Sequence, residues 1–205
     1  MSDGYVALTF DDGPDPDVTP RVLDLLDRYQ ATASFFCVGQ HAARHPDLVR
    51  EILRRGHSVE NHSDRHPTAF ACYGPRALYR EVADAQRAVA DVAGCEPQFF
   101  RAPFGLRNPF LDPVLALMKL RYVSWTRRGF DRVSRSPDKV LFRLSRRLSG
   151  GDILVLHDCR SRLSSAGKPL VLQVLPPLLD HIAHRGLRPV SLPLALASLP
   201  MVETS

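Results

Sequence analysis

Near its start the chain reads Tyr5-Val6-Ala7-Leu8-Thr9-Phe10-Asp11-Asp12-Gly13-Pro14, a short apolar run followed by two carboxylates and a Gly-Pro pair. The apolar run predicts a buried strand, and Gly-Pro predicts the turn that ends it. In folds built on parallel strands, catalytic groups collect in loops after strand ends, where the scaffold holds them rigidly and leaves them open to substrate. Adjacent carboxylates repel each other unless a cation or a proton lies beside them. Asp11 and Asp12 therefore indicate either a charged functional site or an acidic turn that caps the next helix.

Along the rest of the chain, apolar runs of strand length alternate with segments of helical periodicity. Strands are predicted at 5–8, 34–38, 57–60, 98–100, 122–125, 153–156 and 187–192, and helices at 20–29, 46–56, 78–92, 109–119, 137–148 and 170–185. About seven strand-helix units without a linker imply parallel strands joined by helical crossovers. The polar candidates described below follow strands, on one predicted rim, which favours a barrel over an open doubly wound sheet. We expect one α/β domain over residues 1–205, a distorted (β/α)7-type barrel.

The composition is that of a soluble globular protein, with 44% hydrophobic and 24% charged residues in 205. No apolar run approaches the length of a membrane span, and the first strand begins too early to leave room for a signal peptide. These features predict a cytoplasmic protein, although a periplasmic or secreted protein whose leader has been removed would show the same sequence. The net charge of +5 permits an anionic partner without requiring one.

The cysteines show neither a CxxC spacing nor a zinc-ribbon pattern. The chain has four, Cys37, Cys72, Cys95 and Cys159, and we expect them to be reduced and mostly buried. Cys159 follows His157-Asp158 closely, but its apolar context argues against a thiol nucleophile.

Two histidines four residues apart, His62 and His66, follow the third predicted strand. On a helical turn this spacing places two imidazoles on one face, close enough to bind a single metal ion. A capping turn with solvated histidines is the alternative. With Asp12 as third ligand, the set becomes the two histidines and one carboxylate typical of a catalytic divalent ion with open positions. Zinc is the first expectation, and cobalt, nickel or manganese would suit the same ligands.

A metal ion held in this way lowers the pKa of a bound water and polarises a carbonyl oxygen. Asp11 would remain free to act as base on that water, and His157, which follows a different strand, would protonate a leaving group. This set predicts hydrolysis of an amide or an ester. Arg101 is expected to pair with Asp11 and fix its orientation, and Asp131 is the candidate acid that neutralises Arg101.

Four motifs together resemble the polysaccharide deacetylase family, also called the NodB-homology or carbohydrate esterase family 4 domain. They read Thr9-Phe10-Asp11-Asp12-Gly13-Pro14, His62-Ser63-Asp64-Arg65-His66, Arg101-Ala102-Pro103-Phe104 and Leu154-Val155-Leu156-His157, and the match in order and spacing runs from Val6 to about Val190. The resemblance implies a distorted (β/α) barrel and metal-dependent removal of N- or O-acetyl groups from sugars. It implies Asp11 as base, Asp12, His62 and His66 as ligands, Arg101 as the residue orienting the base and His157 as acid. It also implies that Leu154 and Leu156 line the pocket for the acetyl methyl group, with Pro103 and Phe104 at the substrate.

One motif departs from the family pattern, which shows an Asp-Trp pair after the fifth strand. Here the pair reads Asp131-Arg132, so an arginine replaces an apolar wall of the groove, and Phe104 or Phe130 is the candidate substitute. Arg127, Arg128 and Arg132 favour an acetylated glycan that carries negative charge, and a solvated basic face is the alternative.

The sequence leaves two other classes of function to consider. The arginines between 121 and 147 lack interleaved aromatics and a known binding motif, so we expect no nucleic-acid partner. The lost tryptophan motivates a non-catalytic carbohydrate-binding relative, but the base, ligands and acid are all present. A related amide hydrolase, such as a deformylase or a small cyclic amide hydrolase, is the alternative within the enzymes.

Overall fold

A computed structural model describes residues 4–159, 163–164 and 167–197 of the chain. In these residues, parallel strands form one curled sheet in the order β5-β4-β3-β2-β1-β7-β6, with β8 also paired to β1. The strands are β1 (Tyr5–Asp11), β2 (Ser34–Cys37), β3 (Ser58–Asn61), β4 (Phe99–Phe100), β5 (Arg121–Tyr122), β6 (Arg127–Arg128), β7 (Ile153–His157) and β8 (Arg188–Val190). The helices are α1 (Thr19–Arg28), α2 (Gly39–Arg44), α3 (Pro46–Arg54), α4 (Pro75–Ala93), α5 (Leu111–Leu117), α6 (Pro137–Ser145), α7 (Leu170–His184) and α8 (Leu192–Ala197), with 3₁₀ turns η1 (Phe70–Cys72) and η2 (Pro103–Gly105).

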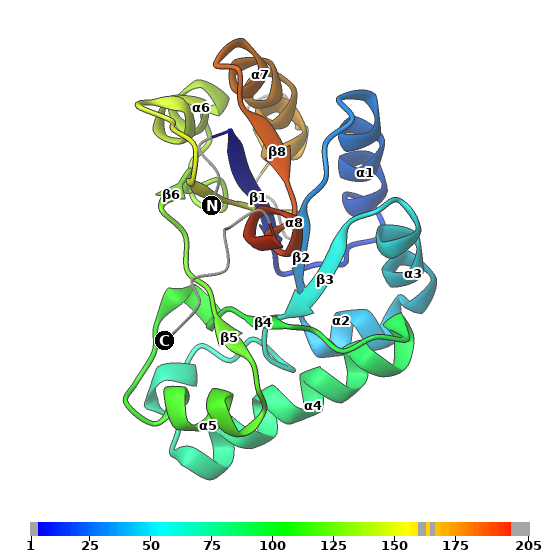
Figure 1. Cartoon of the computed structure of the whole chain (residues 1–205), viewed down its shortest axis with the longest axis vertical. Helices are drawn as coiled ribbons and strands as arrows, with labels where there is room; N and C mark the ends of the chain where they lie inside the picture. The colour runs from blue at the N-terminus through cyan, green and yellow to red at the C-terminus, as the bar shows by residue number, and fades with distance from the viewer. Residues whose placement is uncertain (1–3, 160–162, 165–166, 198–205) are drawn as a thin grey trace, which may run out of the picture.

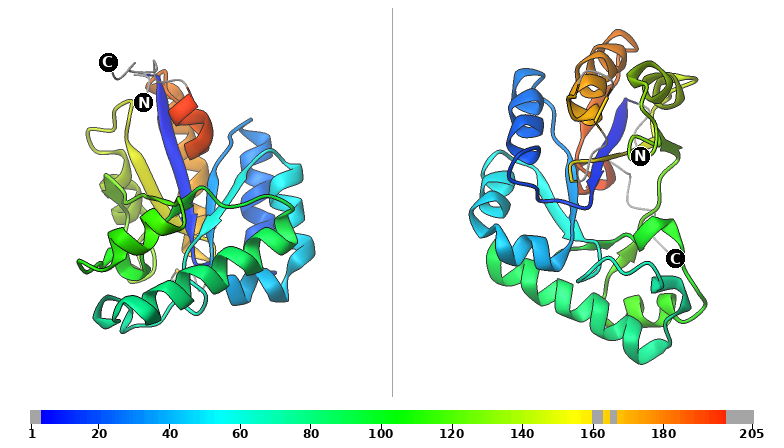
Figure 2. Two further views of the ribbon diagram at one scale, coloured as in Figure 1. Left: turned by 60° about the horizontal axis from the view of Figure 1, so that its bottom comes forward. Right: turned by 180° about the vertical axis from the view of Figure 1, so that it is seen from behind.

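The sheet curls into a barrel that is not fully closed. Strands β5 and β6 end the sheet, and no pairing joins them in the described residues. Figure 1 shows the chain crossing from β5 to β6 as a loop, while helices such as α1, α3 and α4 cover the outside of the sheet. Figure 2 shows the same arrangement from two other sides. The predicted α/β class and distorted barrel are confirmed; residues 1–3 and 198–205 of the predicted domain lie outside the described part.

Strand β1 runs through the centre of the sheet and is buried on both faces. Val6, Leu8 and Phe10 pack into the main apolar cluster, together with residues of helices α1 and α7. Successive side chains of a strand point to opposite faces. Ala7, Thr9 and Asp11 therefore point to the inside of the barrel, and this inward row ends in a carboxylate at the rim.

Several predicted elements differ from the observed ones. Helix α2 was missed because Gly39–Arg44 carries no apolar periodicity, and α8 because its six residues are apolar almost throughout. The predicted strand at 122–125 is observed as β5, and Trp125 lies in the loop before β6. Helix α4 begins at Pro75 and ends at Ala93, and Gly94 caps it with a left-handed φ of 71° that suits glycine. None of the helices in the described residues is both long and apolar enough to span a bilayer.

Candidate active site

The strand register brings the candidate residues to one rim of the barrel. Asp11 of β1 is the Cα partner of His157 of β7. Asn61 of β3 is the partner of Phe100 of β4, so the residues that follow these two strands, His62 and Arg101, also leave the sheet side by side. The carboxyl ends of parallel strands meet at one edge, which explains why residues so distant in sequence converge.

Asp12, His62 and His66 form a cluster able to hold a metal ion. Oδ1 of Asp12 lies 3.4 Å from Nε2 of His62 and 3.2 Å from Nε2 of His66, and the potential ligand atoms all lie within 4.8 Å of one another. Oδ1 of Asp12 is buried and has no hydrogen-bond partner. A buried carboxylate oxygen without a partner is costly, and a cation between it and the two imidazoles would supply one. The cluster therefore fits a divalent ion with two nitrogen ligands and one oxygen ligand.

The protonation states of this cluster also suit a metal ligand set. Nδ1 of His62 donates to the carbonyl of Arg101 over 2.8 Å, which leaves the lone pair on Nε2 for an ion. Burial lowers the pKa of His66 to about 4, so its imidazole is neutral near pH 7. Burial opposes ionisation of Asp12, but the neighbouring histidines outweigh burial and hold the pKa of Asp12 below its ordinary value, so Asp12 is ionised.

The two histidines converge through a loop and not on a helical turn. Asp12, Ser63 and His66 have φ values of 78°, 63° and 53°, in the left-handed region that residues other than glycine seldom occupy. The backbone amide of His66 donates to Oγ of Ser63, and Nδ1 of His41 donates to the carbonyl of Asp12 over 2.7 Å. Backbone strain of this kind gathers at functional sites, where surrounding contacts maintain it.

Arg101 pairs with Asp11, as predicted. Its guanidinium donates to Oδ1 of Asp11 over 2.6 Å and to Oγ1 of Thr9 over 2.8 Å. The other bonds of Arg101 go to the carbonyls of Val123 and Ser124, and its side chain is fully buried. The candidate base Asp11 is thus held by a guanidinium group whose own position is fixed by hydrogen bonds to the backbone.

The predicted pairing of Asp131 with Arg101 is wrong. Asp131 instead accepts two hydrogen bonds from His157, one from the backbone amide and one from Nδ1, each 2.8 Å long. Burial opposes protonation of His157, but the carboxylate of Asp131 more than offsets burial and raises the pKa of His157. Asp131 therefore supports the acid candidate, a role that the sequence analysis did not assign to it.

The pocket over the cluster is narrow, about 10 Å³, close to the space one water molecule needs. Its lining comprises Asp11, Asp12, His62, His66, Phe104, Trp125, Arg128, Arg132, Val155 and His157. The prediction that Leu154 and Leu156 line this pocket is wrong, because both pack outward into the main apolar cluster and Val155 points inward between them. Pro103 is buried and is not part of the lining.

Trp125 is a pocket residue that the sequence analysis missed. It reaches the site from the loop between β5 and β6, with Arg128 stacked 4.9 Å from its ring centroid. Gly105 allows this approach, because a Cβ at that position would lie 2.3 Å from the Trp125 ring. Phe104 packs against His66 with ring centroids 4.8 Å apart, so this phenylalanine forms part of the apolar wall.

Arg132 occupies a position that the sequence analysis assigned to substrate. In the structure its Nη1 donates to Oδ2 of Asp12 over 2.6 Å. The two oxygens of Asp12 thus have separate surroundings, with Oδ2 bound to a guanidinium and Oδ1 facing the two imidazoles.

The model of the polysaccharide deacetylase family matches residues 1–123 of this sequence, more than half of its 205 residues. This chain belongs to the polysaccharide deacetylase family. The matched span contains the cluster of Asp12, His62 and His66 and also the pair of Arg101 with Asp11. The pair of Asp131 with His157 lies beyond it.

Individual deacetylases resemble the chain over most of its length. A chitooligosaccharide deacetylase from Bradyrhizobium sp. (strain ANU 289) is 31% identical over 188 residues, which cover 88% of this chain and 85% of that protein. A peptidoglycan-N-acetylglucosamine deacetylase from Bacillus cereus is 34% identical over 155 residues, 75% of this chain and 72% of that protein. The solved family 4 carbohydrate esterase from Streptomyces lividans in complex with acetate has a TM-score of 0.81 at 34% identity and covers 91% of both chains. The predicted deacetylase-type hydrolase is confirmed.

The cysteines take no part in this site. All four are free; Cys37 and Cys159 are buried, whereas Cys72 and Cys95 are exposed, so the prediction of mostly buried thiols is only half met. Burial, with the charge of Asp158, raises the pKa of Cys159 to about 12, which leaves it protonated and a poor nucleophile.

Proposed function

We propose that this polysaccharide deacetylase uses a divalent metal ion, most simply zinc, to remove N-acetyl groups from a sugar or glycan. The observation that carries the proposal is the arrangement of the rim. A cluster of one carboxylate and two imidazoles shares its pocket with Asp11, which is paired with Arg101, and with His157, which is paired with Asp131. An ester O-acetyl group would meet the same groups, and acetate release from both kinds of substrate distinguishes them.

When bound by Asp12, His62 and His66, the ion supplies a lowered pKa for water and polarisation of the acetyl carbonyl. The protein itself holds the two groups that move protons. Asp11 keeps Oδ1 on Arg101 and has Oδ2 4.0 Å from Nε2 of His62, at the inner wall of the pocket. Oδ2 is therefore placed to take the proton of a water that attacks the acetyl carbon.

His157 serves the leaving group from strand β7, next to Asp11 on strand β1. Nδ1 is bonded to Asp131, so Nε2 is the ring atom that delivers a proton to the sugar nitrogen as the C–N bond breaks. Asp131 raises the pKa of His157 and thereby keeps the ring protonated before that step. A water proton passes to Asp11, a proton passes from His157 to nitrogen, and the products are acetate and the free amine.

The natural substrate is a narrower proposal than the deacetylation reaction. The curated relatives act, by their names, on chitooligosaccharide and on peptidoglycan. We infer that this enzyme acts on an acetylated glycan of that general kind, and the arginines beside the pocket favour one that carries negative charge. The compartment stays a prediction of the sequence.

Two variants test the assignment of base and ligands. Asp11→Asn keeps the size of the side chain and leaves the cluster intact, so zinc binding should persist while kcat for acetate release falls by about 10²–10⁴. His62→Ala should lose zinc, measured by elemental analysis after dialysis. As a control, Asp112→Asn changes an exposed carboxylate paired with Arg107 and should alter neither. Full turnover in Asp11→Asn, or stoichiometric zinc in His62→Ala, would contradict the proposal.

A further inference from the structure

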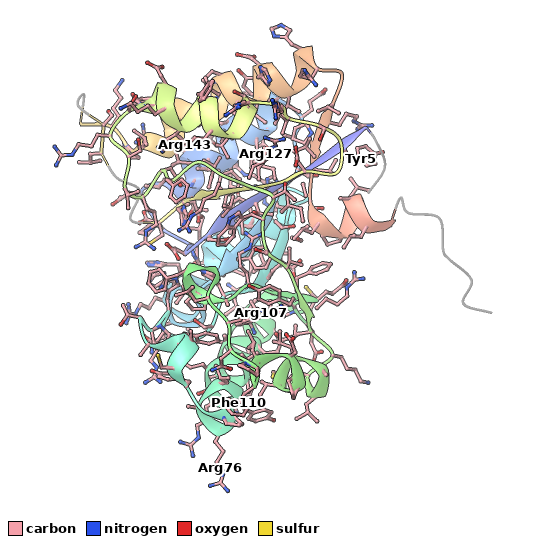
Figure 3. All side chains as sticks on the ribbon, turned by 90° about the vertical axis from the view of Figure 1, so that its left-hand side faces the viewer. Tyr5, Arg76, Arg107, Phe110, Arg127 and Arg143 are labelled. Atoms are coloured by element: carbon pink, nitrogen blue, oxygen red, sulfur yellow. The ribbon has the colours of Figure 1, made fainter. Side chains whose placement is uncertain are left out.

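A groove of about 510 Å³ lies beside the site pocket, between strand β6 and helix α6. Its lining comprises Thr126, Arg127, Arg128, Phe130, Phe142, Arg143, Arg146 and Arg147. Arg128 lines both this groove and the site pocket, so the two spaces adjoin at one side chain. Figure 3 looks onto this face and labels Arg127 and Arg143 near helix α6. We call this space the arginine groove.

The arginine groove has a large excess of positive charge. Five of its eight lining residues are arginines, and none is acidic. In the described residues, Arg128, Arg143, Arg146 and Arg147 form no ion pair with a carboxylate, in contrast to Arg55, which pairs with Asp24, Asp27 and Glu51. Four guanidinium groups without a protein counter-charge favour an anion from outside the chain.

Arg127 maintains the shape of the groove and does not contribute a free charge. It pairs with Asp152 over 2.5 Å and donates to the backbone carbonyls of Arg146 and Arg147. These bonds fix the turn after helix α6 to strand β6. The side chains of Arg146 and Arg147, which are exposed, therefore flank the groove from a fixed backbone.

Aromatic rings lie among these charges. Phe130 and Phe142 are 43% and 61% exposed, which is unusual for phenylalanine in a small domain. Arg128 stacks between the rings of Trp125 and Phe130, 4.9 Å from each centroid, and its buried Nε has no hydrogen-bond partner. Exposed rings pack against the apolar faces of sugar units, and guanidinium groups bind carboxylate or phosphate in a fork. Together they match a sugar that carries an anionic group.

The backbone links the groove directly to the catalytic rim. Gly129 is buried, and a Cβ there would lie 2.6 Å from Val140 of helix α6. Phe130 has a left-handed φ of 61°, and Asp131 follows with its carboxylate on His157. This turn therefore directs one side chain outward into the groove and the next inward to the acid of the reaction, so a sugar chain bound at the groove would lie against the site.

We propose that the arginine groove binds the carboxylate or phosphate of a sugar unit next to the acetylated one, so that the enzyme acts on an acidic glycan. The groove supplies Arg143, Arg146 and Arg147 for the anion and Phe130 for the sugar face. This inference rests on the proposed deacetylase function for its substrate, but the groove itself binds anionic sugar whether or not an acetyl group is present.

The test compares three zinc-loaded proteins on three substrates. The proteins are the wild type, Arg143→Gln/Arg147→Gln, and the matched control Arg76→Gln/Arg80→Gln, which removes the same charge from exposed positions of helix α4. Figure 3 shows Arg76 at the opposite end of the molecule from Arg143. The substrates are a neutral N-acetylhexosamine oligomer, an oligomer that alternates N-acetylhexosamine with hexuronate, and an N-acetylhexosamine oligomer that carries phosphate.

The wild type should show a higher kcat/KM on at least one anionic substrate than on the neutral one, and added salt should reduce that preference. The groove variant should lower the anionic-to-neutral ratio about tenfold through KM, because two partly exposed charge pairs are lost. The Arg76→Gln/Arg80→Gln control should keep the ratio of the wild type. The hexuronate and phosphate arms show which anion is recognised. An equal ratio in all three proteins would overturn the proposal.

Direct binding separates failure of the groove from failure of the proposed reaction. Calorimetry with a hexuronate oligomer and with a phosphate-bearing oligomer, neither with an acetyl group, should show that the wild type binds at least one of them and that the groove variant loses this binding. If no protein releases acetate from any substrate but this binding is seen, the deacetylase function fails and the groove stands. No binding by the wild type, or equally strong binding of a single-stranded oligonucleotide that depends on the same arginines, would overturn the groove as a glycan site.

Discussion

Replacing Asp131 with asparagine should remove the support of the catalytic acid while leaving its position in the fold. Asp131 is fully buried and accepts both the backbone amide and Nδ1 of His157, each over 2.8 Å. Asparagine has one carbonyl oxygen and can accept only one of these bonds, and its amide group then faces a donor. The protonated imidazole loses both a hydrogen bond and an ion pair.

The size of the effect follows from these two contacts. A hydrogen bond to a charged group contributes about 1.5–3 kcal/mol, which corresponds to roughly 10- to 150-fold less protonated His157 above its pKa. In the variant the pKa of His157 falls, because burial, which opposes protonation, is no longer offset by the carboxylate. We therefore expect kcat for acetate release to drop by at least about tenfold near pH 8 and its pH optimum to move to lower pH.

Stability gives an independent measurement of the same pair. Asp131 raises the pKa of His157 in the folded state, so the pair contributes its full stabilisation at pH values below the pKa that His157 has in the unfolded chain. This contribution is lost as pH rises through the pKa that His157 has in the folded protein. Urea unfolding of the chelator-treated protein should show a larger loss for Asp131→Asn near pH 5 than near pH 9. Asp112→Asn, an exposed carboxylate, is the control. An unchanged kcat at pH 8, with equal losses of stability at both pH values, would refute the reasoning.

Three further changes test the site and its surroundings. Leu156→Ala should lower the free energy of unfolding by about 2–5 kcal/mol in urea titrations, because this leucine belongs to the main apolar cluster. Val155→Ala, inside the pocket, should instead change KM, and the reverse result would contradict the observed alternation of side chains along β7. Arg132→Gln should tighten zinc binding about tenfold, because the guanidinium on Oδ2 of Asp12 repels the ion; competition with a chromophoric chelator measures this. Arg132→Lys keeps the positive charge, and equal zinc affinity in the two variants would disprove the explanation. Burial raises the pKa of Glu60 from 4.5 to about 7, so the folded state holds this proton more tightly, and the free energy of unfolding should fall as pH rises from 4.5 to 7. Glu60→Gln should flatten this dependence on pH, and an unaltered slope would exclude Glu60 as its source.

The sequence could predict the rim because its residues follow apolar runs directly. Asp11 and His157 are the last residues of their strands, and Asp12, His62 and Arg101 directly follow strands. Parallel strands bring such residues to one edge whatever the details of packing. The barrel class followed from the same alternation of strands and helices. These inferences depend on order along the chain, which the sequence contains in full.

The errors have physical reasons of their own. Strand β7 is buried on both faces, so its uniformly apolar sequence carries no alternation to show that Val155 points inward and Leu154 and Leu156 outward. The partner of Asp131 was misassigned because Arg101 already obtains its acceptors from Thr9, Asp11 and two carbonyls, a count that only the folded backbone reveals. The His62–His66 loop needs left-handed residues that its sequence does not indicate by glycine.

The burial of Arg101 is better explained by geometry than by stability. A buried ion pair gains little over an apolar pair of similar size, because two charges must leave water, yet removing one partner is costly. In Arg101 one guanidinium nitrogen binds Asp11 and Thr9, and the other two donate to the carbonyls of Val123 and Ser124, directly after β5. A lysine would present one point charge and could not hold the carboxylate and the backbone together. The same logic applies on the neighbouring strand β7, where Asp131 binds both the ring and the backbone of His157. In both pairs the partner residue fixes the reacting side chain relative to the main chain, and the two reacting groups lie on neighbouring strands in direct register. The distance between base and acid is therefore set by the pairing of β1 with β7, and depends little on the loops that carry the metal ligands.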